Sequence, residues 1–323
     1  MQQAGASSRC PKAMVSSTIC CPSFLTEPTS QRSFVLQYLW CCANQGLFGT
    51  VAGTAVIKNV KVAGTIKTLN TNGANIGSIV GVQKGGVIDN CESSVAITAS
   101  GYNVGGIVGV SDGGLISNCK FLGNITSSST AKGNSHHGIG AIVGYLSTKE
   151  AVEVNNCVNE GTITTGSTQV GGIVGLAYGI STVKYLIINC INNGDISSSA
   201  SVNSTTNEGV GGIAGMALYT TIKNCENNGS ITAKNACQVA GIVGKCSDNS
   251  LIENCENNGD IIGISQVGGI SGRHVGGATA NSCTNNGNIY CTSTATTYGQ
   301  ICGHNGATMT NCTENGSKGI YSE

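Results

Sequence analysis

Apolar positions recur along most of this chain in two short phrases that alternate with polar and glycine-rich segments. One phrase has the form I-x-N-C-x-N-x-G-x-I and is clearest at residues 222–231 and 252–261. The other is a glycine-rich apolar phrase such as VGGIVG, which begins at Val104, Val170, Val210, Val239 and Val267. A period of about 30 residues held over most of a chain predicts a solenoid of stacked repeats.

The repeated phrases predict strands joined by bends. Helices do not fit, because both phrases combine β-branched residues with paired glycines and Asn-Gly steps, and neither has an apolar stripe of 3.6-residue period. Strands this short and this evenly spaced predict an all-β fold, a single-stranded parallel β-helix whose coils superpose about 4.8 Å apart. A less regular copy at residues 46–66 precedes eight copies that contain a cysteine. We therefore expect about nine coils, wound right-handed.

Two ladders of equivalent residues are the most regular feature of the predicted coils. Cysteine suits an inward position, because like side chains lie above one another there and the thiol behaves as a small hydrophobic group. Val60 fills that position in the first copy, which favours a core role. Asparagine suits the adjacent bend, since it tolerates left-handed backbone and can pass a hydrogen bond to the next Asn. The predicted ladder residues are Cys91, Cys119, Cys157, Cys190, Cys225, Cys255, Cys283 and Cys312, with Asn90, Asn118, Asn156, Asn189, Asn224, Asn254 and Asn311.

The other cysteines leave two disulfide readings open. Ladder cysteines in adjacent coils would lie close enough for a bridge, but pairing would tilt them out of the stack, so we expect free buried thiols there. The better candidates for a local bridge lie off the ladder, with no pairing determined: Cys237, Cys246, Cys291 and Cys302.

Composition narrows the function. The chain has 48 glycines, 10% charged residues and 4% aromatic residues, which leaves few bulky side chains for an ordinary globular core. Its 16 basic residues balance its 16 acidic residues and form no run of three. We therefore expect no nucleic-acid partner and no attraction to an anionic membrane surface.

Motifs for catalysis or cofactor binding are weak. Residues 209–214 satisfy a dinucleotide-binding pattern, but they are a copy of the repeat phrase, and no helix follows to hold a pyrophosphate. The histidines lack the spacing of a zinc site. Glu226 and Glu256 follow adjacent ladder cysteines, yet Lys120 and Thr284 occupy the same position in other coils, so no acidic groove is expected. We expect no enzyme activity, no cofactor and no metal.

Residues 1–45 depart from the repeat and form a separate predicted region, an N-terminal leader or a cap over the first coil, before a repeat domain at residues 46–323. The apolar segment at residues 34–42 is too short to span a membrane and starts too late for a signal peptide. The sequence predicts neither a membrane span nor an anchor.

The G-G-I-V-G phrase followed by I-x-N-C and N-x-G-x-I resembles the GLUG-motif repeat family over about residues 46–316. The opening copy resembles it too, with GLFG at Gly46–Gly49 and I-K-N-V at residues 57–60. Members of that family are typically large secreted or surface proteins, including adhesin-like proteins and accessory regions of secreted peptidases. The motif brings no catalytic residues of its own.

The resemblance and the residues together imply a non-catalytic extracellular or cell-surface scaffold, adhesin-like, that uses its loops or ladder faces to contact a protein or glycan on another cell or surface. End-to-end or edge association is also expected. The alternative is an accessory β-helical segment of a larger secreted enzyme, a peptidase or a polysaccharide-active enzyme. Ice or crystal-surface binding would need regular T-x-T rows, and Thr162, Thr164 and Thr232 recur too irregularly for one.

The spacing between phrases stretches at residues 126–138 and 197–209, which predicts loops on the rim of the solenoid. Asn124 and Asn203 begin N-x-S/T sequences, are assigned to these loops, and are the candidate glycosylation sites if the protein enters a eukaryotic secretory route.

Overall fold

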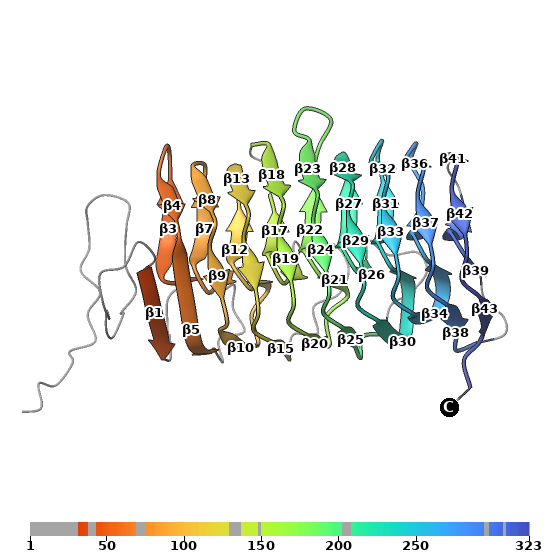
Figure 1. Cartoon of the computed structure of the whole chain (residues 1–323), viewed down its shortest axis with the longest axis horizontal. Helices are drawn as coiled ribbons and strands as arrows, with labels where there is room; N and C mark the ends of the chain where they lie inside the picture. The colour runs from red at the N-terminus through yellow and green to blue at the C-terminus, as the bar shows by residue number, and fades with distance from the viewer. Residues whose placement is uncertain are drawn as a thin grey trace, which may run out of the picture.

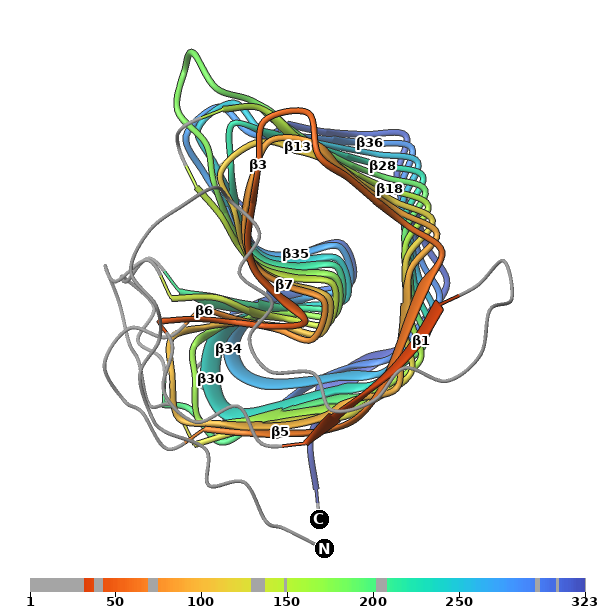
Figure 2. The same cartoon turned by 90° about the vertical axis from the view of Figure 1, so that its left-hand side faces the viewer.

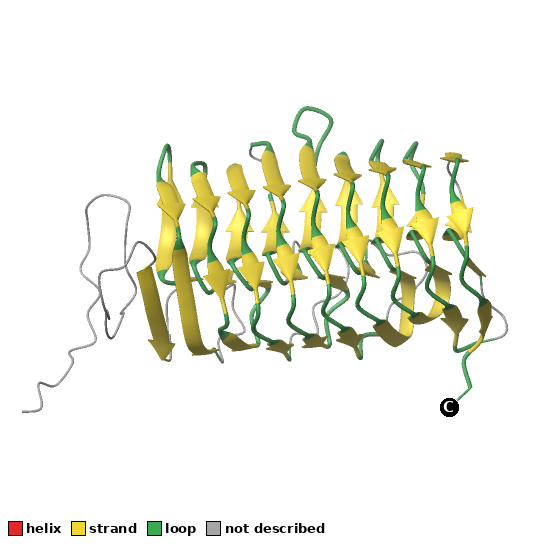
Figure 3. Cartoon of the chain, viewed as in Figure 1, coloured by secondary structure: helices red, strands yellow, loops and turns green. Residues whose placement is uncertain are grey.

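A computed structural model describes residues 32–37, 43–68, 75–128, 137–147, 150–201, 208–293, 297–305 and 308–322. Within these residues the secondary structure is entirely β, and no helix is present, so none is long and apolar enough to cross a membrane. Figures 1 and 3 show the coils side by side along the long axis, from β3 to β41. The predicted parallel β-helix is confirmed.

The strands form three sheets in which neighbouring coils pair in parallel. Sheet B has nine strands: β3 (Phe48–Ala52), β7 (Val80–Lys84), β12 (Val108–Ser111), β17 (Val143–Leu146), β22 (Val174–Tyr178), β27 (Ala214–Leu218), β31 (Val243–Ser247), β35 (Ser271–His274) and β40 (Cys302–Asn305). Sheet C also has nine: β4 (Val56–Lys58), β8 (Val87–Asp89), β13 (Gly114–Ser117), β18 (Val152–Asn155), β23 (Tyr185–Ile188), β28 (Thr220–Lys223), β32 (Leu251–Glu253), β36 (Thr279–Asn281) and β41 (Thr308–Thr310). These counts agree with the expected nine coils, while the handedness stays a prediction.

Sheet A has 25 strands, because most coils contribute more than one segment to it. They are β1 (Arg32–Gln37), β2 (Asn44–Gln45), β5 (Val60–Lys67), β6 (Asn75–Gly77), β9 (Glu92–Ser93), β10 (Ala96–Ala99), β11 (Asn103–Gly105), β14 (Lys120–Phe121), β15 (Ile125–Ser127), β16 (Ile139–Gly140), β19 (Val158–Asn159), β20 (Ile163–Thr165), β21 (Gln169–Gly171), β24 (Ile191–Asn192), β25 (Ile196–Ser198), β26 (Gly209–Gly211), β29 (Glu226–Asn227), β30 (Ile231–Ala240), β33 (Glu256–Asn257), β34 (Ile261–Gly268), β37 (Thr284–Asn285), β38 (Ile289–Cys291), β39 (Tyr298–Gly299), β42 (Thr313–Glu314) and β43 (Lys318–Ile320).

The glycine-rich phrase is a sharp corner between two strands. In one coil it is divided between β11 in sheet A and β12 in sheet B. Seen along the solenoid axis, this part of the wall folds inward along strands such as β6 and returns along strands such as β7 (Figure 2). The chain reverses at the paired glycines, and the two halves of the phrase therefore belong to different sheets.

Close backbone contact explains why glycine is needed on both sides of this corner. A Cβ atom on Gly105 would lie 1.8 Å from the carbonyl oxygen of Val108, and one on Gly109 would lie 2.6 Å from the backbone nitrogen of Ile76. No side chain fits at these distances. The two arms of the inward fold therefore pack backbone against backbone.

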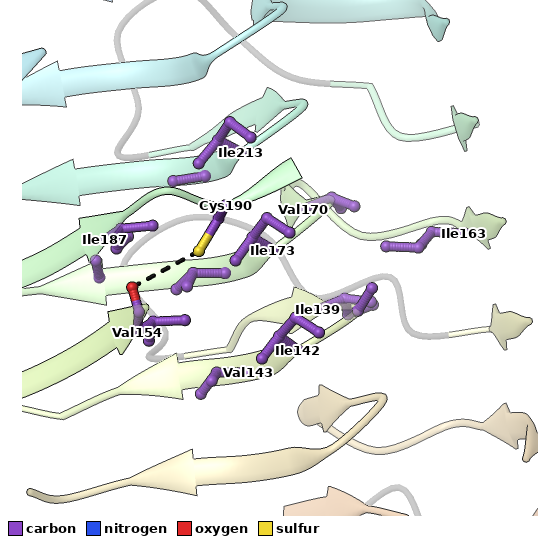
Figure 4. Close-up of a cluster of buried hydrophobic side chains, with 14 of the residues drawn as sticks. Ile139, Ile142, Val143, Val154, Ile163, Val170, Ile173, Ile187, Cys190 and Ile213 are labelled. Carbon is purple, nitrogen blue, oxygen red and sulfur yellow. Dashed lines mark hydrogen bonds between the residues drawn. The ribbon is translucent and has the colours of Figure 1, made fainter. Parts of the chain in front are cut away.

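The core runs the length of the solenoid as stacked aliphatic residues. The isoleucines six residues after the cysteines pair in register from coil to coil, as Ile97 does with Ile125, and they are buried. Figure 4 shows part of this interior, where Ile173 lies beside Cys190 and Ile142 lies in the neighbouring coil. A second, smaller apolar cluster is built from Val82, Val110, Tyr145, Leu176, Met216 and Leu218.

Residues from the predicted leader or cap add strands to the N-terminal end. β1 pairs in parallel with β5, with Arg32 opposite Val60, and Phe34 packs against the core. β2 pairs with β6. Residues 1–31 lie outside the described residues. The division into residues 1–45 and 46–323 stays a prediction.

Candidate functional site

The predicted asparagine ladder follows the bend between sheet C and sheet A. Its members have positive φ, for example 51° at Asn90 and 53° at Asn224, and Ser282 takes the same conformation with φ of 54°. The Nδ2 atom of Asn90 donates to Oδ1 of Asn59 at 2.7 Å, and Asn156 donates to Asn118 at 2.7 Å. The asparagine ladder is therefore confirmed, both in its left-handed backbone and in its hydrogen bonds between coils.

Some asparagines of this ladder donate to the residue that precedes the ladder asparagine of the neighbouring coil. Asn118 donates to the carboxylate of Asp89 at 2.6 Å, and Asn189 donates to Asn155 at 3.0 Å. Hydrogen bonds from Ser117 and Asn118 hold the pKa of Asp89 below its usual value, with a further contribution from Lys58, 3.3 Å away. Side chains of sheet C thus take part in the ladder where the stack is irregular.

The cysteine column lies in the core, on the inward side of the same bend. Seven of its eight members are at most 1% exposed, and Cys312, in the last coil, is half-buried. Each thiol lies against backbone carbonyl oxygens, as Cys190 does at 3.6 Å from Val154 in the preceding coil (Figure 4). Burial raises the pKa of the Cys190 and Cys225 thiols well above the usual value. Neutral buried thiols such as those of Cys190 and Cys225 pack as small hydrophobic groups.

Cys237, Cys246, Cys291 and Cys302 form no disulfide bridge in the structure. Cys237 belongs to the coil of Ile231, and Cys291 to the coil of Ile289, with the coil of Ile261 between them. Two coil spacings are about 9–10 Å, which exceeds the Cα separation that a disulfide spans. Cys246 and Cys302 are likewise two coils apart.

A second amide ladder lies inside the solenoid and was not predicted. Its residues come two positions after the ladder cysteines and are fully buried: Asn159, Asn192, Asn227, Asn257 and Asn285. Asn227 donates to the carbonyl oxygen of Gly229 at 2.9 Å and to Oδ1 of Asn257 at 2.8 Å, and it accepts from Asn192 at 2.7 Å. Gln300 accepts the last bond, from Asn285. Each rung therefore satisfies its own bend and joins two coils.

The buried amides explain a further glycine of the corner phrase. A Cβ atom on Gly212 would lie 2.3 Å from Oδ1 of Asn227, and one on Gly172 would lie 2.5 Å from Oδ1 of Asn192. In an earlier coil the same contact is made by an aromatic ring, since a Cβ atom on Gly106 would lie 2.5 Å from Phe121. The third residue of the phrase is small because a core side chain of the same coil occupies the space.

The outward face of sheet A carries rows of exposed polar residues. Glu226 and Glu256 pair in register, but the same row contains Lys61, Glu92 and Lys120 in earlier coils. Lys61 and Glu92 form an ion pair at 3.2 Å. As expected, the row is mixed in charge and does not form an acidic groove.

A hydroxyl row on this face is more regular than the sequence predicted. Five consecutive coils stack Thr98, Thr126, Thr164, Ser197 and Thr232 in register. The first four are exposed and Thr232 is half-buried. Variable loop lengths hide this row in the sequence, because the distance between its members changes while their register does not.

The candidate glycosylation sites differ in position. Asn124 lies at the bend before β15 and is exposed, and its Oδ1 accepts from the backbone nitrogen and the hydroxyl of Thr162, both at 3.0 Å. It therefore belongs to the stacked coil and lies outside the stretched loop. Asn203 lies outside the described residues, as do residues 129–136 and 202–207 of the predicted rim loops.

Histidines and carboxylates do not gather in the described part of the chain. No three His, Cys, Asp or Glu side chains there lie close enough to hold a metal ion. His137 stacks on Tyr102 with ring centroids 3.7 Å apart. His274 is fully buried in β35, and burial lowers its pKa to about 4.

Comparison with known proteins identifies the repeat. A family model for the GLUG motif matches residues 100–126. A search of curated proteins gave no match. Among solved structures, the chain is similar to a proposed immunoglobulin A1 protease from Bacteroides ovatus, with 17% identity and a TM-score of 0.37 over 88% of this chain and 68% of that one. At this level of similarity, neither activity nor substrate transfers.

The matched segment contains the corner phrase, the ladder pair Asn118 and Cys119, and the first strand residues that follow them. It is thus one coil of a pattern that the structure repeats along the solenoid. The resemblance predicted from the repeat is confirmed: the chain is a parallel β-solenoid that carries the GLUG motif.

Proposed function

We propose that this chain is a non-catalytic extracellular scaffold, adhesin-like, that recognises a glycan on another cell or surface through the outward face of sheet A. The observation that carries the proposal is the exposed hydroxyl row from Thr98 to Thr232, which repeats at the coil spacing. Beside it run Asn124, Thr162, Asp195 and Ser230, two residues before the row in their coils. Hydroxyls and amides both donate and accept, as sugar hydroxyls do.

The rigid scaffold favours this mode of recognition. Rows of side chains held by strand pairing need little ordering on binding, which lowers the entropic cost of contact with a repeating ligand. An extended polysaccharide lying along the rows would meet equivalent groups in successive coils. The extracellular location follows from what is typical of GLUG-motif proteins.

A glycan array probed with the purified chain tests this proposal. Thr126→Val and Thr164→Val together remove two neighbouring hydroxyls but keep the side-chain shape, and we expect at least a tenfold loss of affinity, about 1.4 kcal/mol. Thr221→Val, on the outward face of sheet C, is the matched control. Unchanged glycan binding by the double variant, or no binding by the parent chain, would overturn the proposal.

A version lacking residues 129–136 and 202–207 separates the faces from the rim loops. Full binding by this shortened chain is expected if sheet A carries recognition. Loss of binding, with the strand signal in circular dichroism retained, would instead assign recognition to the loops.

A further inference from the structure

The sheet A face also carries a stacked row of asparagines that each precede a glycine. These residues lie three positions after the ladder cysteines, in five consecutive coils: Asn193, Asn228, Asn258, Asn286 and Asn315. All five side chains are exposed, while Gly229 and Gly259 behind them are buried. Each of these asparagines follows a residue at the position of the buried amide ladder, but its side chain points to solvent instead of the core.

Asparagine deamidates most readily when glycine follows it. Glycine has no side chain, so its backbone nitrogen can approach the asparagine side chain. That nitrogen attacks Cγ of the asparagine, a new C–N bond forms, and the side-chain nitrogen leaves as ammonia. Water then opens the five-membered imide to aspartate or isoaspartate. The balance is one water consumed and one ammonia released, with no oxidant or reductant.

The folded coils hold both reacting groups in hydrogen bonds. The side-chain nitrogen of Asn258 donates to Oδ1 of Asn228 at 2.8 Å, and that of Asn286 donates to Oδ1 of Asn258 at 2.7 Å. The attacking nitrogens are occupied too, since the backbone N–H of Gly229 donates to the carbonyl oxygen of Asn192 at 3.3 Å. Gly287 makes the equivalent bond to Asn257.

Two members of the row also donate to carboxylates. Asn258 donates to Oε1 of Glu226 at 3.1 Å, and Asn286 donates to Oε1 of Glu256 at 2.6 Å. A carboxylate in place of either amide would lie against another carboxylate. Asn228 bonds Asn193 at 2.8 Å instead, so its conversion would set a charge against a neutral amide oxygen.

We propose that this Asn-Gly row is a deamidation site that the fold keeps closed. Local opening of the coils releases the reacting groups from their hydrogen bonds, and conversion of Asn258 or Asn286 then opposes reclosure through repulsion from Glu226 or Glu256. The row would thus record unfolding events in a long-lived chain as irreversible acidic residues.

Mass-spectrometric peptide mapping of the full chain, aged at pH 8 with and without urea, tests the closed state. In urea all five steps should convert at similar rates. In the folded chain the deamidation of Asn228, Asn258 and Asn286 should be slower by at least about tenfold, because the reaction requires local opening. Equal rates in the folded and unfolded chains would overturn the proposal.

Aspartate variants test the consequence. Asn258→Asp should lower the urea midpoint of unfolding more than Asn228→Asp does, and Glu226→Gln should remove most of that difference. Equal midpoints for the two aspartate variants, or no rescue by Glu226→Gln, would contradict the proposed repulsion. Both variants alter an exposed side chain, so folding itself is not at risk.

Discussion

The corner behind the ladder cysteine is filled differently in the first and the later coils. Early coils place Ser93 and then the ring of Phe121 there, both fully buried. The coils from Asn159 to Asn285 place a buried asparagine at the same position, with Asn159 pairing in register with Phe121. The same backbone conformation therefore accommodates either a large apolar side chain or a hydrogen-bonded amide two residues after the ladder cysteine.

Phe121 and the buried asparagines differ in which parts of the structure they contact. Phe121 fills space against the glycines of its own corner, where a Cβ atom on Gly123 would lie 3.1 Å from the ring. A buried asparagine bonds to its own bend and to the next coil as well, as Asn192 does with Gly194 and Asn227. The later coils are therefore coupled by directional hydrogen bonds, and the early coils by packing.

The largest effect is expected from breaking the amide ladder at its middle. Asn227→Ala leaves three buried groups without their bonds: the side chains of Asn192 and Asn257 and the carbonyl of Gly229. At about 1–3 kcal/mol for each buried unsatisfied group, we expect a loss of about 5 kcal/mol in the free energy of unfolding. Urea denaturation measures it. The exposed neighbour Asn228→Ala is the control and should cost less than about 1 kcal/mol; similar losses for both would show that the buried ladder contributes little.

Substitutions of Phe121 compare an aromatic ring with an amide at the same position. Phe121→Ala creates a cavity and should cost about 4 kcal/mol. Phe121→Asn should cost at least about 1 kcal/mol less, because its amide can donate toward Asn159 and extend the ladder by one coil. Thermal and urea denaturation of both variants decide this. An asparagine variant that is no more stable than the alanine variant would mean that this corner specifically requires an aromatic ring.

Acid should loosen the C-terminal coils through His274. Its pKa falls from about 6.5 in the unfolded chain to about 4 in the folded protein because it is buried. The unfolded state therefore binds more protons below pH 6.5, so stability is complete above that pH and is lost progressively between pH 6.5 and 4. The shift corresponds to about 3 kcal/mol. His274→Leu should remove this part of the pH dependence in urea titrations at pH 7 and pH 4, and an unchanged slope would place the titration elsewhere.

The smallest effect is expected in the cysteine column, which is continuous through both regions. In Cys225→Ser the hydroxyl can still donate toward Lys223 or Ile187, whose carbonyls lie 3.3 and 3.5 Å from the thiol. We expect a cost of about 1 kcal/mol. Cys225→Val, which copies the natural Val60 of the first coil, should be similar or milder. A loss above about 3 kcal/mol in both variants would indicate a role for the thiol beyond packing.

The sequence supported predictions wherever a repeat has fixed spacing. The cysteine, the asparagine before it and the isoleucine six residues later lie where their periodicity placed them, because strand pairing preserves that spacing. The hydroxyl row of Thr164 and Ser197 could not be predicted from spacing, since the loops between its members vary in length. The corner at Gly105 depends on contacts between strands of two sheets, which no local pattern encodes.

The buried amide ladder is an intermediate case. Asn192 and Asn193 are neighbours in the sequence, and only one of them is buried. Alternation from the inward Cys190 predicts that the residue two positions later also points inward. That signal is present in the repeated phrase, but where two asparagines are adjacent, composition alone does not indicate which amide is buried.

Native-state hydrogen exchange of the Asn227→Ala variant tests the central claim, that the buried amides couple neighbouring coils. We predict faster backbone exchange in the coil of Cys225 and also in both adjacent coils, at residues 185–198 and 251–262, with coils near Phe121 unchanged. Faster exchange confined to residues 220–232 would contradict the claim, since each asparagine would then serve only its own bend.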